Sequence, residues 1–189
     1  MKIFRKVAIS LAALMMVLGV SAGFQATEVA AAPSKTPQAA YKTYMTRYIY
    51  DRLARENNGK YNYLNLDKKG ATELFVKYTE NGKSVYKVYT YRVKDKKDKI
   101  TLLGTFKNAN SMSVKGTTLR VSRKVGTTTV TTYYKKSALK LLKQNEYEKR
   151  ANGACYKNGK RISVKLYNEK VVAEEDEYAN VFAGAKKVR

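Results

Sequence analysis

Oxygen-bearing side chains surround one glycine turn with the spacing that calcium-binding loops use. Calcium takes about 6–8 oxygen ligands, and loops of the D-x-D-x-D-G type supply side-chain oxygens at the first, third and fifth positions before the glycine. In NLDKKGATE, residues 65–73, these positions carry Asn65, Asp67 and Lys69, and Glu73 stands at the ninth. Two of the three oxygen positions are therefore kept, and the third carries an ammonium group.

The lysines of this loop oppose a bound metal. Lys68 and Lys69 would place two positive charges beside a divalent cation and add no ligand. We therefore predict no metal and interpret Asn65, Asp67 and Glu73 as a degenerate calcium-like loop that Lys69 blocks. Lys69 would fold over the loop and pair with one of the two carboxylates, as a tethered cation. The alternative is a metal-stabilised module, which a calcium-dependent rise in melting temperature would reveal.

The chain lacks the residues that most catalytic sites require. The chain has no His and a single Cys, which removes Ser-His-Asp and Cys-His groupings and the commonest zinc ligand. It contains neither a P-loop nor a G-x-G-x-x-G fingerprint. The acidic run 174–177 is typical of a solvated helix face, and Cys155 of a small buried apolar residue. We predict a protein that is not an enzyme and uses no cofactor.

The chain is strongly basic and rich in tyrosine. It has 38 Lys and Arg against 15 Asp and Glu, a formal charge of +23, and 16 Tyr with no Trp. Such a charge attracts polyanions, and a Tyr ring over a sugar, with Lys or Arg at its anionic substituent, suits a charged glycan. Stacked bases of nucleic acid would suit the same side chains, but we favour nucleic acid less. The polyanion-binding candidates are Lys87, Tyr89, Tyr91, Arg92, Arg120, Arg123, Lys124, Tyr133, Tyr134, Lys135 and Lys136.

A targeting segment opens the chain. Three basic residues among the first six precede an apolar stretch, residues 7–20, and small residues follow. This pattern predicts a secretory signal peptide over residues 1–31, with cleavage after Ala22 or Ala31. The alternative is an uncleaved anchor, although the apolar stretch is short for a membrane span. We expect a secreted, extracellular protein, associated with the cell wall and without stable membrane insertion after cleavage.

Residues 32–189 form one predicted domain, which begins with a helix. Thr36 is a good N-cap and Pro37 fits the first helical position. Apolar and aromatic residues then recur at spacings of three and four, so we predict an amphipathic helix that buries its Tyr stripe and ends at residues 57–59. The alternative for that stripe is an exposed stacking platform.

From residue 60 the hydrophobic period changes from 3.6 to two, which indicates strands. Asn-Gly pairs at 81–82 and 158–159 predict type I′ hairpin turns. Residues 138–150 fit strand or helix, and we prefer strand; Ser163 would cap a second helix. The predicted class is α+β, with an N-terminal amphipathic helix, an antiparallel meander of about seven to eight strands and a short C-terminal helix. The strands are predicted at 72–79, 84–93, 100–106, 117–124, 127–136, 138–150 and around the turn in 154–163.

The stretch YLNLDKKGATELFV, residues 63–76, resembles a D-[IL]-D-G-D-G-x-x-E-L strand-turn-strand motif. That motif occurs in small, largely uncharacterised secreted proteins and lipoproteins of Gram-positive bacteria. In those proteins the motif is followed by a strand rich in Tyr and Val and by a K-x-x-x-L-G strand. Near the C-terminus, N-G-K-x-[VI]-S leads into a helix. Residues 84–93, 99–104 and 158–163, with Tyr167 in the helix, match these features. The resemblance implies export and a β-rich domain, and it implies no reaction.

Together these features predict a secreted, non-enzymatic basic module that binds an anionic cell-wall polymer or another extracellular polyanion, such as a glycan. The alternative is an extracellular protein-interaction or inhibitor-like module whose charge serves only solubility. A neutral, apolar groove would favour that alternative.

Overall fold

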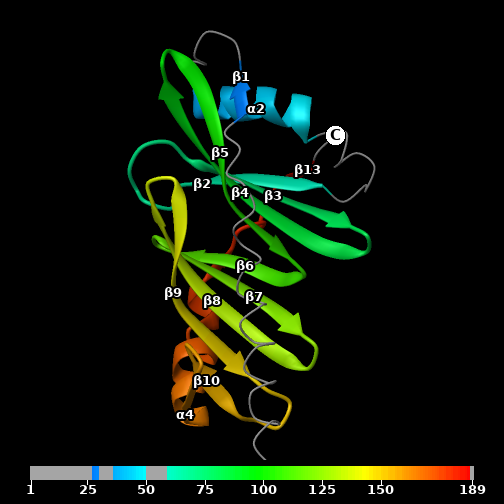
Figure 1. Ribbon diagram of the computed structural model, residues 1–189, viewed down its shortest axis with the longest axis vertical. Coiled ribbons are helices and arrows are strands. Elements are labelled where there is room, and N and C mark those ends of the chain that lie inside the picture. Colours follow the sequence, from blue (N-terminus) through cyan, green and yellow to red (C-terminus); the bar gives the residue numbers. More distant parts are fainter. Residues whose placement is uncertain (1–26, 30–35, 50–58, 188–189) are drawn as a thin grey trace, which may run out of the picture.

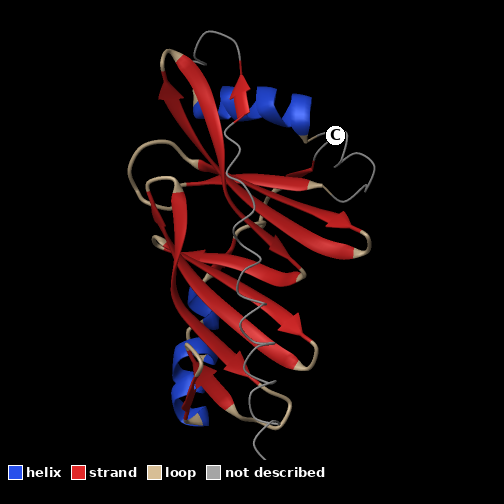
Figure 2. Cartoon of the chain, viewed as in Figure 1, coloured by secondary structure: helices blue, strands red, loops and turns tan. Residues whose placement is uncertain are grey.

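Two antiparallel sheets form most of the computed structural model, which describes residues 27–29, 36–49 and 59–187 (Figures 1 and 2). Sheet A contains, in spatial order, β1 (Thr27–Val29), β5 (Lys97–Lys107), β4 (Lys83–Lys94), β3 (Glu73–Glu80), β2 (Lys60–Leu64) and β13 (Lys186–Lys187). Sheet B contains β11 (Lys160–Ile162), β10 (Cys155–Lys157), β9 (Lys140–Lys149), β8 (Thr128–Ser137), β7 (Thr118–Val125), β6 (Ala109–Lys115) and β12 (Ala179–Asn180). The predicted antiparallel β-structure is confirmed.

A helix covers the outer face of sheet A. Helix α2 (Pro37–Tyr48) begins at Thr36, whose hydroxyl accepts a hydrogen bond from the backbone N–H of Ala39 at 3.2 Å, as the sequence predicted. Tyr41 and Met45 are buried against the sheet, whereas Tyr48 is 50% exposed. The predicted end of this helix at residues 57–59 lies at a segment, 50–58, that is outside the described residues.

Sheet A buries both of its faces, because sheet B packs on the face opposite α2. Alternation along β3 shows this arrangement, since Leu74 and Val76 face α2 whereas Phe75 faces sheet B. The expectation of a single meander of about seven to eight strands is therefore corrected to two stacked sheets. The core between them consists of Leu66, Phe75, Tyr86, Val88, Leu103, Ala109, Met112, Leu119, Val121 and Val181.

The C-terminal segment covers the outer face of sheet B (Figure 1). It consists of α4 (Val164–Tyr167), a π-helical turn η2 (Asn168–Val172) and a 3₁₀ turn η3 (Glu175–Glu177). The Ser163 hydroxyl caps α4 by accepting from the N–H of Leu166 at 3.1 Å, so the short C-terminal helix and its cap are confirmed. Tyr167 and Val171 pack on Tyr133, Tyr147 and Cys155, which buries the Cys as predicted.

Short turns connect the strands. Asn81 and Gly82 both have positive φ, at 52° and 71°, as the predicted type I′ turn requires. Asn158 and Gly159 repeat this geometry between β10 and β11. The strand preferred for residues 138–150 is confirmed as β9.

Several strands were not predicted. β2 and β6 were missed, and so were the edge strands β12 and β13, which contain two residues each. β6, ANSMSVK, holds only two sizeable apolar side chains and no aromatic one, so its strand propensity is weak. Of the predicted signal peptide, only β1 lies among the described residues; it pairs with β5. Across the described residues, the helices are too short or too polar to cross a bilayer.

Candidate functional site

A lysine from the other sheet occupies the calcium-like loop. The Lys136 ammonium on β8 lies 2.7 Å from Asp67 Oδ2 and 2.7 Å from Glu73 Oε1. Glu73 is 0% exposed and also accepts hydrogen bonds from the N–H of Leu66 at 2.8 Å and from the Thr90 hydroxyl at 3.2 Å. The cation among these oxygens is therefore a lysine side chain, which lies 69 residues after Asp67 in the sequence. We call Lys136, Asp67 and Glu73 the inter-sheet ion cluster.

This arrangement corrects the expectation for Lys69. Its backbone N–H donates to Asp67 Oδ1 at 2.9 Å, and the ion pairs of Asp67 and Glu73 in the described residues are formed with Lys136. Burial raises the pKa of Asp67, but hydrogen bonds from Lys136 and from the Lys69 backbone outweigh burial and hold that pKa below its usual value. Burial lowers the pKa of Lys136, and its two carboxylate partners more than offset this and raise it. The loop therefore serves to join the sheets.

The eleven polyanion-binding candidates do not share one surface. Lys87, Tyr89 and Tyr91 lie on the face of sheet A that meets α2, and Tyr134 and Lys136 lie between the sheets. Arg120, Tyr133 and Lys135 lie on the outer face of sheet B. Arg92 is half-buried, and Arg123 and Lys124 are exposed near the end of β7. Arg120 is itself only 4% exposed and pairs with Glu175 at 3.1 Å.

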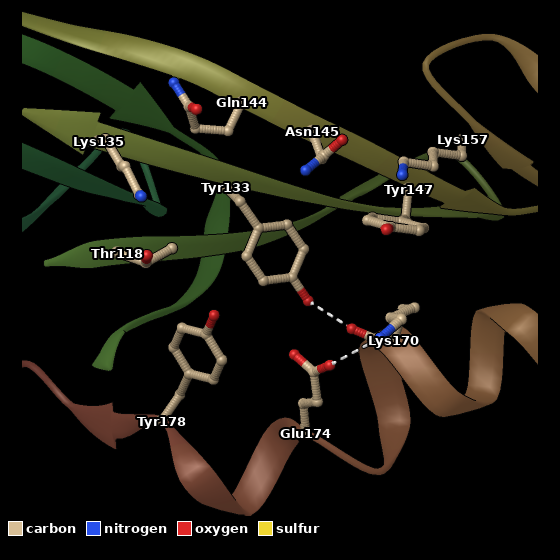
Figure 3. A pocket seen from close by; sticks show the side chains of 10 residues that line it. All are labelled: Thr118, Tyr133, Lys135, Gln144, Asn145, Tyr147, Lys157, Lys170, Glu174 and Tyr178. Carbon is tan, nitrogen blue, oxygen red and sulfur yellow. Dashed lines mark hydrogen bonds and ion pairs between the residues drawn. The ribbon is translucent and has the colours of Figure 1, made fainter. Parts of the chain in front are cut away.

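A cavity of about 390 Å³ lies between the outer face of sheet B and the C-terminal segment (Figure 3). Two of the candidates, Tyr133 and Lys135, line it. The other lining residues were missed, although Tyr147 and Lys157 are of the same aromatic and basic types as the chosen residues. We call this cavity the tyrosine–lysine pocket. Its full lining is Thr118, Tyr133, Lys135, Gln144, Asn145, Tyr147, Lys157, Lys170, Glu174 and Tyr178.

Two backbone irregularities meet at this pocket. β9 has a β-bulge at Gln144, which has no partner on β8, because Tyr133 of β8 pairs with Asn145 and Tyr134 pairs with Lys143. On the opposite wall, the N–H of Ala173 bonds to the carbonyl of Asn168 in η2 at 2.8 Å, and the Tyr133 hydroxyl donates to the carbonyl of Lys170 at 3.1 Å. β-bulges and π-helical turns are both frequent at functional sites.

The pocket is cationic and aromatic. Its charges are three lysines against Glu174, whose Oε1 lies 3.7 Å from the Lys170 ammonium. The Tyr133 ring packs edge-on against Tyr147 at 5.8 Å and Tyr178 at 5.9 Å between ring centroids. The Lys157 ammonium stands 5.7 Å from the centre of the Tyr147 ring.

The hydroxyls of Tyr133 and Tyr178 stay neutral at physiological pH. Burial raises the pKa of Tyr133 to about 12, and burial together with the Glu174 charge raises that of Tyr178. These side chains can hold a ring and an anion by stacking, hydrogen bonds and charge. Within the described residues, no three His, Cys, Asp or Glu side chains are grouped to hold a metal ion.

A scan against models of protein families finds no match for this chain, and searches of curated proteins and of solved structures find no significant match. No relative therefore supplies a function. The chemistry of the pocket and the distribution of charge are the available guides to the function.

Proposed function

We propose that this chain is an exported, non-enzymatic α+β module that associates with an anionic cell-wall polymer or another extracellular polyanion. The observation that carries the proposal is that the surplus of basic side chains in the described residues lies at the surface. A surplus of basic residues attracts anions only where the cations reach solvent. The positions of the two signs in the fold therefore matter more than the net charge.

Several acidic groups of the described domain lie inside it. Glu73 is 0% and Asp98 3% exposed, and Asp67 is half-buried in the inter-sheet ion cluster. Among the basic residues of the described part, Arg120 is buried and the Lys136 side chain is 8% exposed. Two buried acidic and two buried basic side chains offset one another, so the basic surplus of the described residues lies at the surface. Exposed lysines stand at many turns and strand ends, including Lys83, Lys94, Lys96, Lys97, Lys107, Lys140 and Lys160.

The tyrosine–lysine pocket favours this proposal over a protein-interaction module. A docking groove for a protein would be expected to present an apolar floor, and this pocket presents lysines, amides and tyrosine hydroxyls. Among the exposed large apolar side chains of the described residues, Val93, Val125 and Leu142 belong to three different strands, whereas Val164, Leu166 and Val172 lie on the C-terminal segment. Single exposed apolar residues such as those on the strands are normal on a protein surface.

The test is binding of the purified protein to isolated cell walls, with and without teichoic acid, over a series of salt concentrations. We expect binding that requires the teichoic acid and falls steeply with salt, because exposed charges are screened over about 8–10 Å at physiological ionic strength. Changing Lys94 and Lys96 to Glu is expected to weaken it. Absence of binding at low salt, or binding indifferent to teichoic acid and salt, would exclude the cell-wall polymer as the partner, and failure to bind an immobilised sulfated glycan at low salt as well would overturn the proposal.

A further inference from the structure

We propose that the tyrosine–lysine pocket binds one sugar unit that carries a carboxylate or phosphate group. This inference rests on the proposed function and narrows its ligand from polyanions in general to polymers with acidic sugar units. The pocket volume of about 390 Å³ lies within the range of about 300–1,000 Å³ that is usual for small-molecule sites.

The charges of the pocket fix how such a ligand would lie. Lys135 and Lys157 belong to β8 and β10, on the sheet side, and within the described residues neither forms an ion pair. Lys170 and Glu174 belong to the C-terminal segment and lie 3.7 Å apart, so each partly offsets the other (Figure 3). Lys135 and Lys157 lie on opposite sides of Tyr133 in the pocket (Figure 3), so the anionic group of one sugar unit would meet one of these two lysines. The Glu174 carboxylate on the opposite wall disfavours a second anion on the same unit.

The remaining side chains suit a hydroxylated ring. Tyr178 is half-buried and presents its ring beside that of Tyr133, on the wall opposite the strands (Figure 3). The amides of Gln144 and Asn145 and the hydroxyl of Thr118 line the floor and can each both donate and accept hydrogen bonds. The β-bulge that inserts Gln144 changes the direction of side chains at this point of the strand. Groups of these kinds recognise sugar hydroxyls, whereas lysines alone would bind any anion.

The experiment is a titration of the isotope-labelled protein, followed by the backbone amide NMR signals of the pocket residues. The probes are a uronic-acid disaccharide, a hexose 6-phosphate, glycerol phosphate as an anion without a ring, and glucose as a ring without an anion. We expect shifts in the pocket signals with one or both acidic sugars, which also identifies the anionic group, and at least about tenfold weaker binding of glycerol phosphate and of glucose. Equal binding of glycerol phosphate and hexose phosphate would overturn the inference, as would the absence of pocket shifts with both acidic sugars.

Charge-matched variants separate the pocket from the general charge of the surface. Changing both Lys135 and Lys157 to Gln is expected to weaken acidic-sugar binding by about tenfold or more, because it removes the charge-assisted contact at whichever of the two lysines the anion meets. Changing Lys94 and Lys97, which flank the exposed β4–β5 turn, to Gln removes the same charge and is expected to change that binding less than about twofold. Equal effects of the two variants, once both are shown to be folded by circular dichroism, would overturn the inference.

Cell-wall binding distinguishes failure of this inference from failure of the proposed function. If wild-type protein binds walls in a salt-dependent manner but no acidic sugar shifts the pocket signals, the pocket assignment is wrong and polyanion association stands. If binding to walls and to an immobilised sulfated glycan is absent as well, the proposed function itself is wrong.

Discussion

Replacement of Lys136 by Met should destabilise the protein more than any other exchange of a single lysine. The Lys136 side chain is 8% exposed and its partner Glu73 is 0% exposed, so the variant leaves a buried carboxylate without its counter-ion. Removing one member of a buried ion pair costs about 3–5 kcal/mol. Because 1 kcal/mol shifts the melting temperature of a chain of this size by about 2–4 °C, a fall of about 10 °C is expected. Urea unfolding at pH 7, followed by far-ultraviolet circular dichroism, measures the free energy directly.

A double-mutant cycle tests the reason for that loss. Changing Glu73 to Gln removes the buried charge, so the double variant with Lys136→Met should lose at least about 1 kcal/mol less than the two single losses together. Lys135→Met is the control, because this neighbouring side chain is exposed on the other face of β8, and it should change stability by less than about 0.5 kcal/mol. A loss below about 1 kcal/mol for Lys136→Met, or strict additivity in the cycle, would show that the inter-sheet ion cluster does not hold the sheets together.

Other perturbations follow from the same contacts. Millimolar calcium should leave the melting temperature of the wild type unchanged in scanning fluorimetry, because the Lys136 ammonium stands among the loop oxygens; a clear rise would support the metal-stabilised alternative. Folding lowers the pKa of Asp67. Its carboxylate therefore contributes its full stabilisation above the pKa of the unfolded state, and this stabilisation is lost as pH falls through the pKa of the folded state. Melting temperatures measured below about pH 4 should fall more steeply for wild type than for Asp67→Asn. The fold raises the pKa of Tyr91 and of Tyr133 to about 12. Their contribution to stability is therefore present below pH 10 and is lost as pH rises through 12. Absorbance at 295 nm should show tyrosines that ionise at higher pH than the exposed ones, and a single titration near pH 10 would contradict this. Tyr133→Phe removes the bond to the Lys170 carbonyl and should lower the free energy of unfolding measured in urea by about 1 kcal/mol. No loss would mean that this hydrogen bond does not stabilise the fold.

Local signals in the sequence predicted local structure well. The Thr36 and Ser163 caps and the Asn81-Gly82 and Asn158-Gly159 turns depend on residues within a few positions of one another, and each forms as expected. The preference for strand at residues 138–150 succeeded because neighbouring strands were available as partners. These features need no knowledge of the tertiary fold.

The two-sheet arrangement could not be predicted by the same route, although β3 contained a hint of it. Its sequence ELFVKYTE buries Leu74 and Val76 on one face and Glu73 and Phe75 on the other. A strand that is apolar on both faces needs a cover on each side. The buried Glu73 shows that one of those covers also carries a counter-charge. No local pattern identifies Lys136 as its source, because the contact joins segments far apart in the chain.

The tyrosine–lysine pocket was only partly predictable for a related reason. Tyr133 and Lys135 were found by composition, but the same rule also selected Tyr134 and Lys136, which face the other sheet. Composition does not show on which face a side chain lies. The bulge at Gln144 and the π-helical turn have no signal in the sequence that the principles of turn and strand propensity would detect.

Strand β8 supplies Lys136 to the inter-sheet ion cluster on one face and Lys135 to the tyrosine–lysine pocket on the other. Which lysine lies on which face depends on the register of the strand. Side chains alternate between the faces of a strand, so a shift of one residue would exchange the two sets. The segment 131–136 reads TTYYKK, and such a shift would place Tyr134 at the position of Tyr133 and Lys136 at the position of Lys135, although Lys135 would then take the position of Tyr134. Side-chain type at these positions therefore specifies the register weakly. The short turns that bound β8, with positive φ at Gly126 and Ala138, must set it, because loop length fixes the register of a hairpin. The same turns thereby direct Lys136 to the inter-sheet ion cluster and leave Lys135 for a ligand.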